Sequence, residues 1–134
     1  MKTFPTDGKI NFLLCEDFRN EQGGKASLLG AFLGGDIVIQ EEKKEGLALP
    51  SLAFIFIFND GSGTFDSKVE VLSPENKQII PDSRSAPAEK KPETPMSVIF
   101  KIAPFPAIEG TYKARVLLND RLYEREFKIK YQKG

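Results

Sequence analysis

Residues 109–131 have the sequence EGTYKARVLLNDRLYEREFKIKY, in which apolar and charged residues alternate on both sides of Asn119-Asp120. Such alternation is typical of β-strands with one face in a core and the other in water. Asn and Asp tolerate positive φ and therefore favour a two-residue turn between antiparallel strands. This register places Arg115 opposite Glu124 on the solvent face, whereas a slip by one residue would place charges against aromatic rings. The expected core-facing pairs are Val116 with Tyr123 and Tyr112 with Phe127.

The same period of two extends over most of the chain, and Gly, Pro, Asn and Asp interrupt it about every ten residues, as in all-β sandwiches. No convincing stretch longer than two turns has the 3.6-residue period of a helix. We therefore expect one all-β domain over residues 1–134, built from two packed sheets. The expected strands are Ile10–Cys15, Ala26–Leu33, Asp36–Gln40, Ser51–Phe58, Thr64–Leu72, Met96–Ile102, Thr111–Leu118 and Arg121–Tyr131.

Ser51–Phe58 differs from the other strands because both of its faces are apolar. One face carries aromatic rings, those of Phe54, Phe56 and Phe58. The other face carries aliphatic side chains, those of Ala53, Ile55 and Ile57. A strand of this kind lies in the middle of a sheet, and its second face needs a cover. The cover is either a loop or Leu47-Ala48-Leu49 of the same chain, or else a partner surface, so Ala53, Ile55 and Ile57 form a candidate interaction surface.

Two segments lack the patterning of a strand. Residues 41–46, EEKKEG, form a mixed charge run that indicates a solvated turn. Residues 81–95 contain four prolines and are long for a connection inside a compact domain. We expect a Pro-rich loop there, which is either a mobile crossover or a binding loop.

The charged residues balance, with 19 basic and 19 acidic side chains and no His. This composition gives no field that would attract nucleic acid or a membrane surface, and it excludes catalysis or metal binding by histidine. The single Cys15 excludes an intrachain disulfide and indicates a reducing compartment. The N-terminus lacks the apolar stretch of a signal peptide, and no run is long enough to span a membrane. We therefore expect a cytoplasmic protein without cofactors, nucleic-acid partner or membrane partner.

Several motifs look like binding or catalytic loops but have the wrong spacing. Residues 24–27, GKAS, resemble the end of a phosphate-binding loop, yet the required Gly and Ser or Thr are missing. Residues 60–64, DGSGT, have Asp60 and Thr64 where a nucleophile elbow around Ser62 requires Gly. Asp60 and Asp66 supply too few carboxylates for calcium. Both loops are expected to be hairpin connections.

The densest polar cluster follows the first strand and consists of Glu16, Asp17, Arg19 and Glu21. Paired carboxylates can act as general acid and base, but they also occur at strand ends as solvated partners of Arg. The alternation places Cys15 beside the core, where a thiol behaves as a small apolar group. Residues 111–134 carry seven basic and three acidic side chains, without the exposed aromatic rings that stack on bases. We predict no catalytic, cofactor-binding or metal-binding residues.

Glu109-Gly110-Thr111-Tyr112-Lys113-Ala114 resembles the entry to strand F of immunoglobulin-like domains. In those domains a corner Tyr hydrogen-bonds back to the backbone, two residues before a Cys. Tyr112 matches the corner Tyr, and Ala114 stands in the place of the Cys. The resemblance implies an immunoglobulin-like, antiparallel two-sheet sandwich with Greek-key connections and without the intersheet disulfide.

Residues 12–17, FLLCED, with Arg19, Glu21 and residues 24–32, GKASLLGAF, resemble a bacterial family known only as a domain of unknown function. That resemblance implies an immunoglobulin-like sandwich over nearly the whole chain, and it implies no activity. The favoured function is a non-catalytic interaction module that binds a protein partner or a second copy. The alternatives are a structural subunit of a phage or secreted assembly and, less favoured, a small hydrolase that uses Glu16 and Asp17.

Overall fold

The computed structural model describes residues 2–23, 25–34, 36–40, 46–79 and 85–132. Within these residues the chain forms eleven β-strands and one 3-10 turn. The elements are η1 (Asp7–Lys9), β1 (Ile10–Glu21), β2 (Lys25–Ala31), β3 (Asp36–Ile39), β4 (Ala48–Leu49), β5 (Leu52–Phe58), β6 (Gly63–Leu72), β7 (Ala86–Lys90), β8 (Met96–Ile102), β9 (Phe105–Pro106), β10 (Gly110–Leu118) and β11 (Arg121–Tyr131). The fold is all-β, as the sequence predicts.

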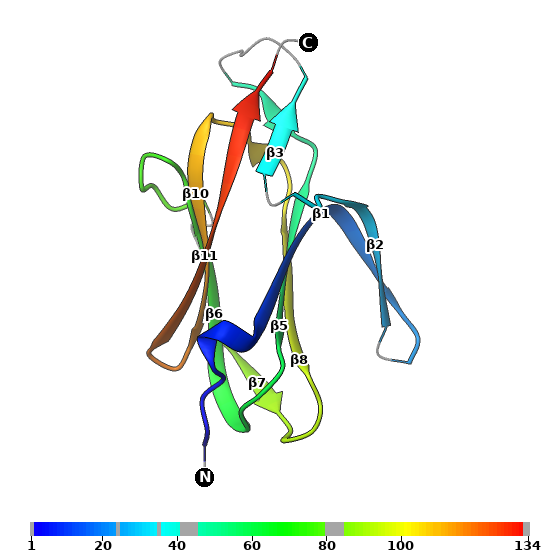
Figure 1. Ribbon diagram of the computed structural model, residues 1–134, viewed down its shortest axis with the longest axis vertical. Helices are drawn as coiled ribbons and strands as arrows, with labels where there is room; N and C mark the ends of the chain where they lie inside the picture. Colours follow the sequence, from blue (N-terminus) through cyan, green and yellow to red (C-terminus); the bar gives the residue numbers. More distant parts are fainter. Residues whose placement is uncertain (1, 24, 35, 41–45, 80–84, 133–134) are drawn as a thin grey trace.

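Two sheets make up most of the molecule (Figure 1). One sheet has four strands in the order β2-β1-β5-β8, and the other has five in the order β3-β11-β10-β6-β7. A separate short ribbon joins β4 to β9. Within the described residues, neighbouring strands are antiparallel except that β3 runs parallel to β11. The expected antiparallel pairing is therefore wrong at this one pair. The chain crosses from β2 in the first sheet to β3 at the edge of the second sheet, where it runs in the same direction as β11.

The β10–β11 hairpin has the register that the alternation predicts. Arg115 lies opposite Glu124, and the other expected pairs are also present. Asn119 has a φ of +54° in the turn, which its side chain tolerates. Arg115 donates from Nε to Glu124 at 2.6 Å and pairs with Glu70 of β6 at 3.1 Å. Cross-strand charge pairing therefore extends over three strands of the outer face.

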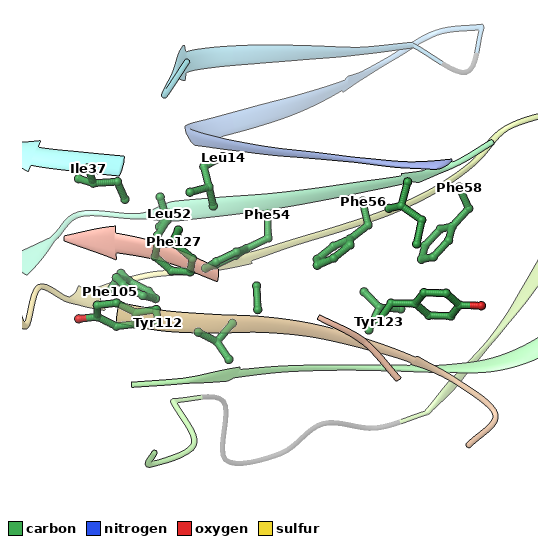
Figure 2. Close-up of a cluster of buried hydrophobic side chains, with 14 of the residues drawn as sticks. Leu14, Ile37, Leu52, Phe54, Phe56, Phe58, Phe105, Tyr112, Tyr123 and Phe127 are labelled. Atoms are coloured by element: carbon green, nitrogen blue, oxygen red, sulfur yellow. The ribbon is translucent and has the colours of Figure 1, made fainter. Parts of the chain in front are cut away.

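The core lies between the two main sheets and is rich in aromatic rings. Figure 2 shows Phe54, Phe56 and Phe58 of β5 on one side of it, with Tyr123 and Phe127 of β11 on the other. The ring centroids of Phe54 and Phe127 are 5.7 Å apart, and those of Phe58 and Tyr123 are 5.4 Å apart. Edge-on ring pairs at such distances stabilise a fold by about 0.5–1.5 kcal/mol, in addition to the hydrophobic gain from burying the rings. The aromatic face of β5 is therefore its core face.

The segment expected to be a Pro-rich loop contains a strand. Ala86–Lys90 form β7, which pairs with β6 at the edge of the five-stranded sheet. The prolines hid this strand, but an edge strand tolerates Pro87 because one side of its backbone has no ladder to maintain. Residues 81–84 lie outside the described residues, as do residues 41–45 of the predicted charged turn.

The N-terminal residues 2–9, here called the strap, cross one end of the sandwich and bind the last strand. The hydroxyl of Tyr123 donates to the carbonyl of Pro5 at 2.7 Å. Arg125 donates to the carboxylate of Asp7 at 3.1 Å and to its backbone carbonyl at 2.6 Å. These contacts fix the strap to β11, 118 positions further along the chain.

Candidate functional site

β1 changes its pairing partner along its length. Its residues 10–15 pair with β5, and its residues 15–21 pair with β2. The sequence predicts a strand that ends at Cys15, because charged residues follow; the structure continues it to Glu21. This second half leaves the sandwich together with β2 as a hairpin, to the right in Figure 1. We call this hairpin, residues 16–23 and 25–31, the arm.

A glycine permits the close contact where the arm leaves the sheet. Gly30 has a φ of +66° and lies against the side chain of Glu16. A Cβ at Gly30 would stand 2.7 Å from the carboxyl carbon of Glu16, closer than side chains normally approach. The hydroxyl of Ser51 also donates to the backbone carbonyl of Glu16. At the base of the arm, Glu16 therefore packs against Gly30 and accepts a hydrogen bond from Ser51.

The predicted interaction surface on β5 is covered in part by the arm. Ala53 and Ile55 are buried in a small cluster with Cys15, and Phe18 of the arm packs against that cluster. Ile57 packs at its margin and is only partly buried. The other proposed cover, Leu47-Ala48-Leu49, contributes Ala48–Leu49 to the ribbon with β9 instead. The chain itself therefore covers Ala53 and Ile55, whereas Ile57 remains partly accessible.

A groove of about 480 Å³ lies between the arm and the outer face of β5 and β8. Its apolar lining consists of Leu13, Ala26, Leu28, Ile55, Ile57 and Ile99. Its polar lining consists of Asn20, Glu21, Lys25 and Ser97. The groove is thus apolar along its floor and carries one acidic and one basic residue toward the tip of the arm. We refer to it below as the arm groove.

β2 is exposed along nearly its whole length. Only Ser27 of its seven residues is partly covered. Leu28 is 37% exposed and Leu29 is 46% exposed, and as neighbours in a strand they lie on opposite faces of the arm. The strand therefore buries little apolar surface within this chain, and Gly30 interrupts its extended backbone with a φ of +66°.

In the acidic cluster, the carboxylate of Asp17 has two partners. Asp17 accepts a hydrogen bond from its neighbour Phe18 at 2.8 Å and pairs with Lys101 of β8 at 3.2 Å. The Phe18 N–H and the Lys101 ammonium lower the pKa of Asp17 below its ordinary value. Arg19 and Glu21 form an exposed ion pair at 3.7 Å. A carboxylate held ionised in this way has no proton to donate near neutral pH.

The DGSGT loop has a structural role in attaching the strap. Ser62 and Thr3 exchange two backbone hydrogen bonds of 2.8 Å. The carboxylate of Asp60 accepts from the backbone N–H and the hydroxyl of Thr6, and these contacts lower its pKa. Across the residues that the structure describes, no three Asp, Glu or Cys side chains gather as a metal site. Gly24 of the GKAS motif lies outside the described residues, and Lys25–Ala31 form β2 rather than a helix.

Cys15 and Tyr112 are both buried. The Cys15 thiol donates to the carbonyl of Asp17 at 3.1 Å, and burial raises its pKa, so the reactive thiolate is disfavoured. The Tyr112 hydroxyl donates to the carbonyl of Pro106 and accepts from the N–H of Ile108, each at 2.7 Å. Burial raises the pKa of Tyr112 to about 12. Tyr112 thus makes the kind of backbone contact that the immunoglobulin-like resemblance implies.

A scan of protein-family models and a search of curated proteins both find no match to this chain. Within the part of the chain that the structure describes, no helix is long and apolar enough to cross a membrane.

The sequence reasoning missed part of this site: Leu28 of the arm and Ile99 of β8, which line the groove, and Phe18, which packs on the cluster around Cys15. A signal for part of it was present, because residues 26–31, ASLLGA, contain two adjacent leucines and no charge. That pattern cannot be distinguished from an ordinary buried strand until the partner of β2 is known.

Proposed function

We propose that this protein is a non-catalytic protein-interaction module of the bacterial cytoplasm and that the arm groove and the open edge of β2 form its contact site. The observation that carries the proposal is an apolar groove left open beside an exposed strand. The partial burial of Ile57 and the exposure of Leu13 and Leu28 support it, because apolar side chains that face a shared groove favour a partner. The ion pair of Asp17 supports a binding role over the hydrolase alternative.

The mechanism that we propose is addition of a β-strand to β2, with side chains of the added strand in the arm groove. Strand addition uses backbone hydrogen bonds for affinity and pockets for alternate side chains for selectivity. The open edge of β2 offers the backbone hydrogen bonds, and the groove beside Leu28 and Ile57 offers the pockets for side chains.

We also propose an immunoglobulin-like topology for the sandwich. In immunoglobulin variable domains one sheet has the order G-F-C-C′ and the other includes A-B-E. The order β11-β10-β6-β7 in one sheet and β1-β5-β8 in the other support this assignment. The corner contact of Tyr112 supports it further. We further propose that the chain belongs to the bacterial family of unknown function that it resembles.

Affinity capture from the native cell, combined with a measurement of mass in solution, tests the binding role. Leu13→Lys places a charge in the groove at a position that is 38% exposed, so the fold should tolerate it. The matched control is Leu122→Lys, which is 46% exposed on the other sheet. We expect the wild type and Leu122→Lys to bind the same partner, a second copy included, and Leu13→Lys to lose most of it. Equal binding by all three, or none by the wild type, would remove the proposal.

One observation favours a second role, as the repeating subunit of an assembly. Within the described residues, β2 and β8 are two open edges of the same sheet. Pairing of β2 of one copy with β8 of the next would be head-to-tail and would build an open chain of subunits. Electron microscopy of concentrated protein should then show filaments, whereas discrete particles of one or two chains would exclude this role.

A further inference from the structure

We propose that the partner at β2 is a second copy of this chain, joined by antiparallel pairing of the two β2 strands around a two-fold axis at Leu28. This inference rests on the proposed binding role and names its partner. It concerns the edge of β2, where the described chain supplies a neighbour, β1, on one side only.

The edge of β2 lacks the features by which proteins protect an open strand. Natural edge strands are kept from pairing by proline, by charged side chains or by short length. β7, at an edge of the other sheet, contains Pro87, Glu89 and Lys90 within five residues. β3, at the opposite edge, is four residues long. β2 has seven residues, no proline and one charge, Lys25, at its first position.

The symmetry of an antiparallel ladder limits the possible registers. Hydrogen-bonded and non-hydrogen-bonded pairs alternate along the ladder, so a two-fold axis must pass between two copies of the same residue. Leu28 is the middle residue of Lys25–Ala31. An axis at Leu28 is therefore the register that sets all seven residues of each strand opposite the other copy, with Lys25 opposite Ala31 and the left-handed Gly30 opposite Ala26.

This register also completes an apolar row. Within one chain Phe18 of β1 lies opposite Leu28 of β2. Pairing at Leu28 places the four side chains of the dimer in the order Phe18, Leu28, Leu28, Phe18 across the face that lines the arm groove. Directly opposed apolar side chains stabilise a sheet, and this row covers the exposed part of Leu28. On the other face, Leu29 lies opposite the small polar Ser27 of the second copy.

The size of the contact sets its strength. A standard stable interface uses about 20–30 residues on each side, and paired β2 strands with the flanking row use fewer. The association should therefore be reversible, and the measured mass should rise from one chain of 14.9 kDa toward twice that value as concentration increases.

A charge-exchange experiment tests both the partner and the register. Leu28→Lys places two like charges opposite each other at the axis, and Leu28→Glu does the same with the opposite sign. We expect each variant alone to associate at least about tenfold more weakly than the wild type, and an equimolar mixture of the two to recover association. Sedimentation velocity over a range of concentrations measures the mass. Thermal unfolding of each variant shows that the exposed position leaves the fold intact.

Leu29→Lys is the matched control, because its lysine would face Ser27 rather than a second lysine. It should associate much more strongly than Leu28→Lys. A wild type that keeps the mass of one chain at every concentration would overturn the dimer, and so would a mixture that fails to associate. If the dimer is overturned in this way, a different partner whose capture is lost in Leu13→Lys would still support the proposed binding role. The absence of any captured partner would overturn both the dimer and the binding role.

Discussion

At the scale of single residues, polar groups of buried side chains determine where backbone segments attach. Tyr112 is fully buried, yet its hydroxyl satisfies one donor and one acceptor of the segment before β10. The hydroxyl of Tyr123 satisfies one acceptor of the strap, the carbonyl of Pro5. Burying a backbone N–H or carbonyl without a partner costs about 1–3 kcal/mol, so each hydroxyl stabilises the segment that it contacts.

Tyr112→Phe removes the hydroxyl and keeps the ring. The N–H of Ile108 and the carbonyl of Pro106 then lose their partner, and we expect the free energy of unfolding to fall by about 1–3 kcal/mol. Urea unfolding of both proteins measures the difference. An unchanged midpoint would mean that water replaces the hydroxyl at this corner and that the corner contact adds no stability.

At the scale of elements, some strands could be predicted from the sequence and others could not. The β10–β11 register followed from alternation and a two-residue turn, which are both local. The partner change of β1 at Cys15 was not predictable, because the charges of residues 16–21 are equally typical of a strand end and of an exposed strand. β7 was missed because Pro87 and the prolines around the strand look like loop residues, and its pairing with β6 is a non-local contact.

The sequence singled out two residues of the groove lining, Ile55 and Ile57, but not the residues that the arm contributes. The alternation in Ser51–Phe58 identified Ala53, Ile55 and Ile57 as the second apolar face of a central strand. The residues that face them across the groove come from the arm, whose position depends on where β1 leaves the sheet. Tertiary packing, rather than any local pattern, sets that point.

The arm should be the least stable part of the described fold at low protein concentration. A two-stranded hairpin is marginal in water, and Phe18 is the arm residue that packs on the cluster around Cys15. We expect backbone amides of β2 to exchange with deuterium faster than those of β10, which has neighbours on both sides. Hydrogen exchange followed by mass spectrometry measures this. Equal protection in β2 and β10 in the dilute protein would contradict the expectation.

At the scale of the whole molecule, the strap connects the two sheets at one end of the sandwich. It pairs with the β5–β6 connection through Thr3 and Thr6, and with β11 through Pro5 and Asp7. Contacts between such distant parts of the chain stabilise the fold as one unit. The charges involved make part of this stability depend on pH.

Asp60→Asn tests the attachment of the strap. Thr6 donates to the Asp60 carboxylate and lowers its pKa below the ordinary value of 3.8. A pKa lowered in the folded state means that the stabilisation is present above pH 3.8 and is lost as pH falls through the folded-state value. The variant should therefore be less stable than the wild type at neutral pH, and the difference should shrink in acid. Unfolding curves across this range measure it, and a difference that grows in acid would contradict the assignment.

The attachment of the strap to β11 has a consequence for the order in which the protein is made. The ribosome synthesises Pro5 and Asp7 118 residues before Tyr123 and Arg125, the side chains that bind them. Until β11 has been synthesised, the strap lacks the strand that binds it. The β10–β11 hairpin therefore fastens a segment that was made 118 residues earlier, and this end of the sandwich is joined only after β11 has left the ribosome.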